Sequence, residues 1–106
     1  MVKNLTENTF DIAINSGDTV VVDFWAEWCG PCKMMHSVIE ETASEMPNVK
    51  FYKLNIDEYP DIAQKNKIMS IPTMLIFADG EAVGSLVGAM PKPNLIREIS
   101  KFTETK

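Results

Sequence analysis

The sequence predicts an α/β fold in which a central mixed sheet of about five strands is flanked by about four helices. Three patterns support this class. Short apolar runs rich in β-branched residues alternate with longer stretches of helical spacing. Asp79–Gly80 is a strong two-residue hairpin signal between the last two strand-like runs. An amphipathic stretch of helical spacing lies near the end of the chain. We therefore expect helices on both faces of the sheet.

The first half of the chain predicts a short helix, a buried strand and a longer helix. The helix covers residues 7–15, with apolar positions at Phe10, Ile12, Ala13 and Ile14. Ser16–Gly17–Asp18 then breaks it. Residues 20–25 are nearly continuously apolar, which is typical of a strand covered on both faces. From residue 31 to about residue 45, apolar positions recur at helical spacing, at Met34, Met35, Val38, Ile39, Thr42 and Ala43.

The second half predicts three more strands and two more helices. Residues 49–56 form a second strand, and Pro60 opens a short helix that contains Ile62 and Ala63. Residues 73–78 form a third long strand, and residues 81–87 return antiparallel to it. A glycine inside that last strand, Gly84, indicates a bulge. A final helix begins near Pro93 and carries one apolar stripe, formed by Leu95, Ile96, Ile99 and Phe102.

Size, charge and composition limit what the protein can be. With 106 residues, the chain is expected to be a single domain over residues 1–106. The net charge of −5, without a Lys/Arg cluster, opposes binding to nucleic acid. The N-terminus has no signal-peptide pattern, and no apolar run approaches the roughly 20 residues that cross a bilayer. We expect a cytoplasmic protein without a membrane partner.

The two cysteines of the chain, Cys29 and Cys32, lie within Trp28–Cys29–Gly30–Pro31–Cys32, directly after a predicted strand and at the start of a predicted helix. Residues three apart in a helical turn lie about 5–6 Å apart, within the range that a disulfide tolerates. The unpaired N–H groups of the first turn favour a thiolate at Cys29. We therefore expect Cys29 to be exposed and reactive, and Cys32, one turn further in, to be less exposed and less acidic.

Three other interpretations of the cysteine pair are possible. A static disulfide is poorly motivated, since so short a loop constrains the unfolded chain little. A metal site could recruit His36, but structural zinc needs four ligands and the motif offers three candidates. Haem attachment needs a histidine directly after the second cysteine, where Lys33 stands. Redox chemistry of the dithiol is therefore favoured, with no metal.

Four segments, in matching order and spacing, resemble the thioredoxin family. They are residues 22–34, Lys53–Leu54–Asn55–Ile56–Asp57, Ile71–Pro72–Thr73 and Val87–Gly88–Ala89. The resemblance spans essentially the whole chain and implies the thioredoxin fold. The chain departs from the family at two positions. Ser37 replaces the usual helix-kinking proline, which predicts a straighter helix, and Pro91 replaces the usual serine cap before the last helix.

The resemblance assigns roles around the dithiol. Cys29 is the nucleophile, Cys32 resolves the mixed disulfide, and the two cysteines form the disulfide. Asp23 is an acid inside an apolar strand, so that burial should raise its pKa. In the family the matching aspartate lies behind the resolving cysteine and helps to deprotonate it. The resemblance also makes Lys53 the partner of Asp23.

The resemblance further implies a docking surface for substrate. A cis bond before Pro72 would lie against the dithiol, and Gly30 and Pro31 would shape the site. Substrate would contact Trp28, Ile71, Val87, Gly88 and Ala89. We expect Trp25 to pack beneath the site and His36 to be a helix surface residue without a catalytic role.

The function implied is that of a monomeric, general protein disulfide reductase, a thiol-disulfide oxidoreductase that cycles between the Cys29/Cys32 dithiol and its disulfide. It would hold no bound cofactor and would receive electrons from a thioredoxin reductase that draws on NADPH or another donor. Its substrates would be proteins with disulfides. Two alternatives remain: an oxidase or isomerase on the same fold, and a non-enzymatic thioredoxin-like subunit that binds a partner around Trp28.

Overall fold

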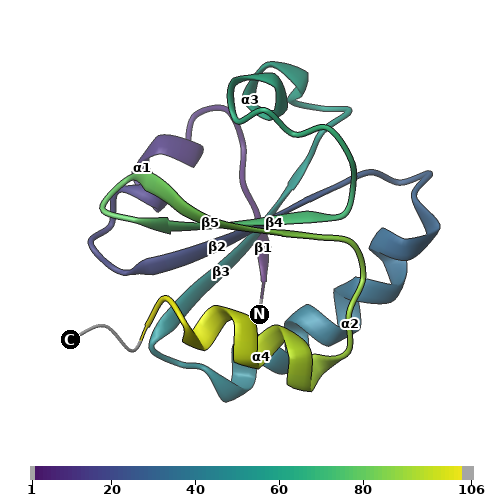
Figure 1. The fold of residues 1–106 in the computed structure, drawn as a ribbon. Helices are drawn as coiled ribbons and strands as arrows, with labels where there is room; N and C mark the ends of the chain where they lie inside the picture. Colours follow the sequence, from purple (N-terminus) through teal and green to yellow (C-terminus); the bar gives the residue numbers. More distant parts are fainter. Residues whose placement is uncertain (1, 104–106) are drawn as a thin grey trace.

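The computed structural model describes residues 2–103, which form one sheet with helices on both faces (Figure 1). The predicted fold class is therefore confirmed. In chain order the elements are β1 (Lys3–Asn4), α1 (Phe10–Ile14), β2 (Thr19–Trp25), α2 (Gly30–Glu45), β3 (Val49–Asn55), α3 (Pro60–Lys65), β4 (Thr73–Ala78), β5 (Glu81–Val87) and α4 (Lys92–Ser100).

The sheet has the strand order β1-β3-β2-β4-β5 and is mixed. The strands β1, β3 and β2 run parallel, whereas β4 is antiparallel to β2 and forms a hairpin with β5. The central strand β2 therefore has neighbours on both sides. Its carboxyl end leads into α2, and the end of β3 lies at the same edge, so this edge is where a site is expected.

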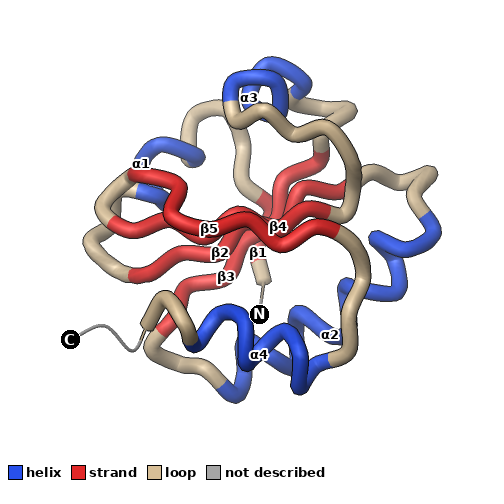
Figure 2. The backbone as a smooth tube through the Cα atoms, in the orientation of Figure 1, coloured by secondary structure: helices blue, strands red, loops and turns tan. Residues whose placement is uncertain are grey.

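Figure 2 shows α1 and α3 on one side of the sheet and α2 and α4 on the other. An apolar core lies on each side. Because successive strand residues point to opposite faces, Val20, Val22 and Phe24 of β2 pack on the side of α1 and α3. Val21 packs on the other side, with buried residues of α2 and α4. Asp23 has the same parity as Val21, so its side chain faces α2. The alternation thus places one acid within an otherwise apolar layer.

Two predictions near the N-terminus need correction. The fifth strand of the sheet is β1, a two-residue strand that no sequence pattern located, because both of its residues are exposed and carry no apolar alternation. The first helix covers Phe10–Ile14 and not residues 7–15. Its start is delayed because the N–H of Thr6 bonds Oγ1 of Thr9 at 2.8 Å, which holds a turn before the helix.

The apolar stripes of the helices were also predicted too broadly. Ile12 in α1 and Met34 in α2 are exposed, although both were expected at apolar, inward positions. Met35 and Ile39 of α2 are buried as expected, and so are Leu95 and Ile99 of α4. Helical spacing identifies the buried stripe, but residues at its margin are placed by the neighbouring elements and not by their own hydrophobicity.

The β4–β5 hairpin has the predicted irregularity. Ile76 pairs with Gly84 whereas Phe77 pairs with Ala82, so that one extra residue, Val83, is accommodated in β5. Gly84 is next to this bulge, and a Cβ atom there would collide with the ring of Phe102. Glycine at this position therefore allows the segment after α4 to lie closely on the sheet.

Candidate active site

The two cysteines lie at the start of α2, where the local sequence builds a helix N-terminus. Cys29 is the N-cap residue with extended backbone angles (φ −90°, ψ 106°), and Pro31 occupies the first turn, where its missing N–H costs nothing. The backbone N–H of Cys32 donates to Sγ of Cys29 at 3.2 Å. The positive end of the helix therefore points at the Cys29 sulfur, as an activated thiolate needs.

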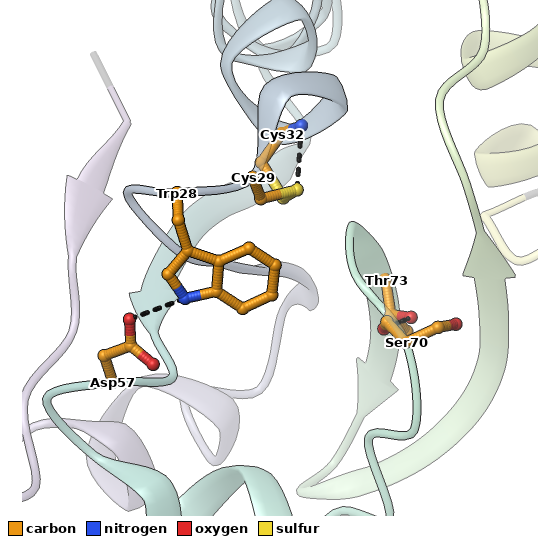
Figure 3. Close-up of a disulfide and its surroundings, with 6 residues drawn as sticks. All are labelled: Trp28, Cys29, Cys32, Asp57, Ser70 and Thr73. Carbon is orange, nitrogen blue, oxygen red and sulfur yellow. Dashed lines mark hydrogen bonds between the residues drawn. A yellow bond between two sulfur atoms is a disulfide. The ribbon is translucent and has the colours of Figure 1, made fainter.

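Cys29 and Cys32 are joined in a disulfide, with their Cα atoms 5.3 Å apart (Figure 3). The expectation of an exposed Cys29 is wrong for this oxidised form, since Cys29 is 4% exposed and Cys32 is 0% exposed. Trp25, Ala26, Ile56 and Ile71 pack around the pair and cover it. The predicted order, with Cys32 the more buried, holds.

Trp28 is the exposed apolar side chain beside the disulfide, at 70% exposure. Its indole Nε1 donates to Oδ2 of Asp57 at 2.9 Å, so the large ring is held at one rotamer although it faces solvent (Figure 3). The sequence-based predictions give Asp57 no functional role. Its position could have indicated one, because Asp57 follows β3 at the same edge of the sheet at which Cys29 follows β2.

Asp23 is the most unusual polar group near the site. It is 1% exposed, and within the described residues neither carboxylate oxygen has a hydrogen-bond partner. Burial raises the pKa of Asp23 from 3.8 to about 7, against the opposing effect of Lys53. A group with this pKa can both accept and release a proton near neutral pH, as a proton carrier must.

Lys53 lies across from Asp23 in the parallel pairing of β2 with β3. Its Nζ is 5.6 Å from the centroid of the Trp25 ring, within the range of a cation–π contact. Trp25 itself is nearly buried, and its Nε1 donates to Oδ1 of Asn4 at 3.2 Å. Trp25 therefore packs beneath the site, as predicted, and its ring contacts the ammonium group of Lys53.

His36 differs from its prediction as a helix surface residue. Its imidazole packs edge-on against Trp25, with ring centroids 5.0 Å apart and an interplanar angle of 85°. Its Nε2 is buried and has no hydrogen-bond partner in the described part of the chain. The correction arises because α2 lies on the sheet face that carries Trp25, so a histidine one turn after Cys32 meets that ring.

The loop before β4, with Ser70 and Thr73, lies across from Trp28 (Figure 3). The Ile71–Pro72 peptide bond is cis, and Ile71 packs on the cysteine cluster. Oγ1 of Thr73 donates to the carbonyl of Ser70 at 2.6 Å, which closes this loop. The N–H of Gly88 donates to the carbonyl of Pro72 at 2.8 Å. Two loops distant in sequence are thereby joined.

The remaining predicted docking residues differ in their exposure to solvent. Val87 is 62% exposed, Ala89 is exposed, and Gly88 is partly exposed with φ of 93°, a conformation that favours glycine. Gly30 and Pro31 are exposed at the start of α2, and Pro72 is buried. Within residues 2–103, no group of three or more His, Cys, Asp or Glu side chains is arranged to hold a metal ion. No helix in that range is long and apolar enough to cross a membrane.

A cysteine pair at disulfide distance on a helix N-terminus, in this mixed sheet, defines a thiol-disulfide oxidoreductase. The family model described as thioredoxin matches residues 1–101. The chain is 49% identical over 86 residues to Thioredoxin-1 of Saccharomyces cerevisiae, which covers 81% of this chain and 84% of that protein. It is 48% identical over 98 residues to a thioredoxin of Staphylococcus saprophyticus, which covers 92% and 93%.

Solved structures agree with this assignment. A thioredoxin of Plasmodium falciparum superposes with a TM-score of 0.89 at 36% identity, over 95% of this chain and 99% of that one. The oxidised mitochondrial thioredoxin 3 of Saccharomyces cerevisiae gives 0.86 at 36% identity, over 94% of each chain. The chain belongs to the thioredoxin family.

Proposed function

We propose that this thiol-disulfide oxidoreductase acts as a general protein disulfide reductase, as one monomeric domain. The observation that carries the proposal is the position of Cys29 at the N-cap of α2, with the N–H of Cys32 donating to its sulfur. In the reduced protein the same donor and the helix N-terminus stabilise the Cys29 thiolate. The nucleophile and its resolving partner are thus fixed on one rigid helical turn.

The reaction takes place in two thiol–disulfide exchanges. The Cys29 thiolate attacks one sulfur of a substrate disulfide, forms a mixed disulfide and releases the other sulfur as a thiolate. Asp23 then accepts the proton of the Cys32 thiol. The Cys32 thiolate attacks Sγ of Cys29, forms the Cys29–Cys32 disulfide and releases the second substrate thiolate. Lys53 keeps a fraction of Asp23 ionised, since its charge lowers the pKa that burial raises.

Exposed apolar residues near the disulfide would suit contact with an extended substrate chain. Trp28 and Val87 present exposed apolar contacts on the two sides, and Ala89 and Gly88 lie beyond Val87. A groove of about 390 Å³ continues from Val87 along the loop that contains Ser70. The Ile71 backbone, before the cis-proline, would pair with the substrate main chain.

We propose that a thioredoxin reductase regenerates the dithiol with electrons from NADPH or another donor. Proteins with disulfides are the substrates. The cytoplasm is the compartment in which this protein would encounter its reductase and its substrates. The chain would need no bound cofactor, since the dithiol itself carries the electrons. Its net charge of −5 favours protein partners over nucleic acid.

The experiment that tests the roles is trapping by Cys32→Ser. Without the resolving thiol, Cys29 is expected to remain joined to substrate, so that adducts sensitive to dithiothreitol accumulate on non-reducing gels. Cys29→Ser is the matched control and should form none. If Cys32→Ser accumulates no adducts with a disulfide protein such as insulin, the assigned roles are wrong.

Insulin reduction separates this proposal from a non-enzymatic binding subunit. The wild-type protein, supplied with dithiothreitol, is expected to accelerate precipitation of the insulin chains, and Cys29→Ser is expected to lose that acceleration. Equal behaviour of the two proteins would favour the binding function instead.

A further inference from the structure

The buried acid Asp23 and the single histidine, His36, line the same small cavity. The cavity measures about 10 Å³, about the volume that one water requires. Its other lining residues are Val2, Ile39, Glu40 and Lys53. Both oxygens of Asp23 and Nε2 of His36 are buried without a hydrogen-bond partner in the described residues. A water here would find the polar partners that a buried water needs.

One stripe of α2 connects the resolving cysteine with this cavity and with the surface. Cys32, His36 and Glu40 follow one another at intervals of four residues and therefore lie along one stripe of the helix. The first is fully buried, the second is partly buried and the third is exposed. Glu40 accepts from the N–H of Val2 at 3.2 Å, which fixes it beside the cavity. The stripe thus runs from the buried resolving thiol to the exposed Glu40, and His36, which shares the cavity with Asp23, lies between them.

The geometry points to His36 as a positioning residue that exchanges protons with Asp23 through one water held in this cavity. The inference rests on the proposed role of Asp23. Once Asp23 has taken the proton of Cys32, it passes a proton to the water, and the water passes one to Nε2 of His36. Asp23 is then again a carboxylate, and the imidazolium releases its proton to solvent. No electrons move in this exchange.

The charges around His36 fit such a role. Lys53 of β3 faces both Asp23 and His36. Burial and the charge of Lys53 lower the pKa of His36, whereas the charges of Glu27 and Glu40 raise it. The imidazole is therefore neutral at pH 7 and free to accept a proton. Nζ of Lys53 lies over the Trp25 ring, and His36 packs edge-on against the same ring. One indole therefore contacts both basic side chains. Asp23 is the remaining ionisable group that lines the cavity.

The first test is an NMR titration of the His36 imidazole in the reduced protein between pH 4 and pH 9. In wild type, the His36 shift is expected to show a second inflection where Asp23 titrates. Asp23→Asn should remove that inflection, and Ser37→Ala, an exposed neighbour on α2, should retain it. Superimposable His36 curves for wild type and Asp23→Asn would overturn the inference.

The second test follows the Cys32 step by stopped-flow tryptophan fluorescence at saturating insulin. His36→Gln keeps a polar group but accepts no proton, and His36→Phe keeps the contact with Trp25. Both are expected to slow the step roughly tenfold at pH 7, less than the loss of an acid–base group itself. Ser37→Ala is expected to keep the wild-type rate. Wild-type rates in both His36 variants would overturn the inference.

The two failures can be told apart. If Asp23→Asn slows the Cys32 step while the His36 variants do not, the path through His36 is wrong and the proposed function stands. If wild type reduces no disulfide, the proposed function falls. The titration needs no turnover, so it still decides whether Asp23 and His36 are coupled.

Discussion

At the scale of single residues, the site depends on an acid placed where a carboxylate is least stable. Asp23 lies in the central strand, 1% exposed, and within residues 2–103 its oxygens have no hydrogen-bond partner. Such burial normally destabilises a fold, because the charged form loses its hydration. In the proposed mechanism the benefit is chemical: the same desolvation moves the pKa of Asp23 to about 7, where it would exchange a proton with a thiol efficiently.

The first prediction concerns stability and pH at Asp23. Its pKa is raised on folding, so the folded state binds the proton more tightly and stability falls as pH rises from about 4 to about 7. A shift from 3.8 to about 7 corresponds to about 4 kcal/mol at pH 8. Asp23→Asn should therefore be more stable than wild type at pH 8, by a few kcal/mol, and nearly equal to it at pH 4.

Urea unfolding of the oxidised proteins at the two pH values measures this difference. Glu58→Gln, an exposed acid, is the control and should shift stability little at either pH. A stability gain for Asp23→Asn that is the same at pH 4 and pH 8 would contradict the pKa assignment.

The second prediction concerns the bond between Trp28 and Asp57. Asp57→Ala removes the acceptor of the indole N–H, which then bonds water, so the exposed ring gains rotamers. Time-resolved anisotropy of Trp28 fluorescence, measured in a Trp25→Phe background, should show a larger fast component. Overall stability should fall by no more than about 1 kcal/mol, because the bond is exposed. Unchanged anisotropy would mean that other contacts fix the ring.

At the scale of elements, α2 connects the chemistry to the core. Its first turn carries both cysteines, its buried stripe contains Met35 and Ile39, and Oγ1 of Thr42 donates to the carbonyl of Val38 at 2.8 Å. The cysteines thus lie at the start of a helix that packs on the core, whereas Trp28 and Ile71 lie on loops. In the proposed function, this division would hold the sulfur atoms in place and leave the docking residues adaptable.

The third prediction concerns the shape of α2. Without a proline at position 37, its N–H remains available to the helix, and the axis is expected to run without a sharp bend through Ser37. Ser37→Pro should introduce a kink, since proline removes a donor and clashes with the preceding turn. Helix-axis angles from crystal structures of both proteins check this, and a sharp bend in wild type would contradict it.

The fourth prediction concerns the contact of the last segment with the sheet. In Gly84→Ala the new Cβ meets the ring of Phe102, which must move aside. Because the contact is with the tip of the ring, at the far end of the Phe102 side chain, we expect a cost of about 1 kcal/mol. A double-mutant cycle with Phe102→Ala tests the cause: in that background the cost of Gly84→Ala should shrink. An undiminished cost would assign it to the β5 backbone instead.

At the scale of the whole molecule, two core layers on a five-stranded sheet hold the dithiol at one edge. Residues from three parts of the chain meet there: the start of α2, the cis-proline loop and the loop after β5. The hairpin of β4 and β5 joins the last two, through the bond from Gly88 to Pro72. We therefore expect the redox poise of the cysteine pair to depend on the assembled fold as well as on the motif.

The fifth prediction concerns that poise. For a reductase, the reduction potential of the Cys29–Cys32 couple should be about −270 mV, which is the reference value for thioredoxin. Equilibration with glutathione or dithiothreitol buffers, followed by tryptophan fluorescence, measures it. A potential near about −120 mV would instead indicate an oxidant.

Much of the architecture could be predicted because its signals are local. The apolar run of β2, the Asp79–Gly80 turn and the helical spacing after Pro31 each depend on residues close in sequence. The β1 strand could not be predicted, since its exposed residues are paired by β3 and not by their own pattern. The exposure of Ile12 and Met34, at the margins of the helical stripes, could not be predicted for the same reason. Neighbouring elements decide which side of a helix is covered.

The sequence by itself determined the fold class, the cysteine pair and the helix N-terminus that activates it, because each follows from spacing along a few residues. The tertiary structure decided how buried Cys29 is, that Asp57 restrains Trp28, and that His36 shares a cavity with Asp23. These depend on packing between segments distant in the chain. Burial and desolvation arise where elements meet, and no local pattern records them.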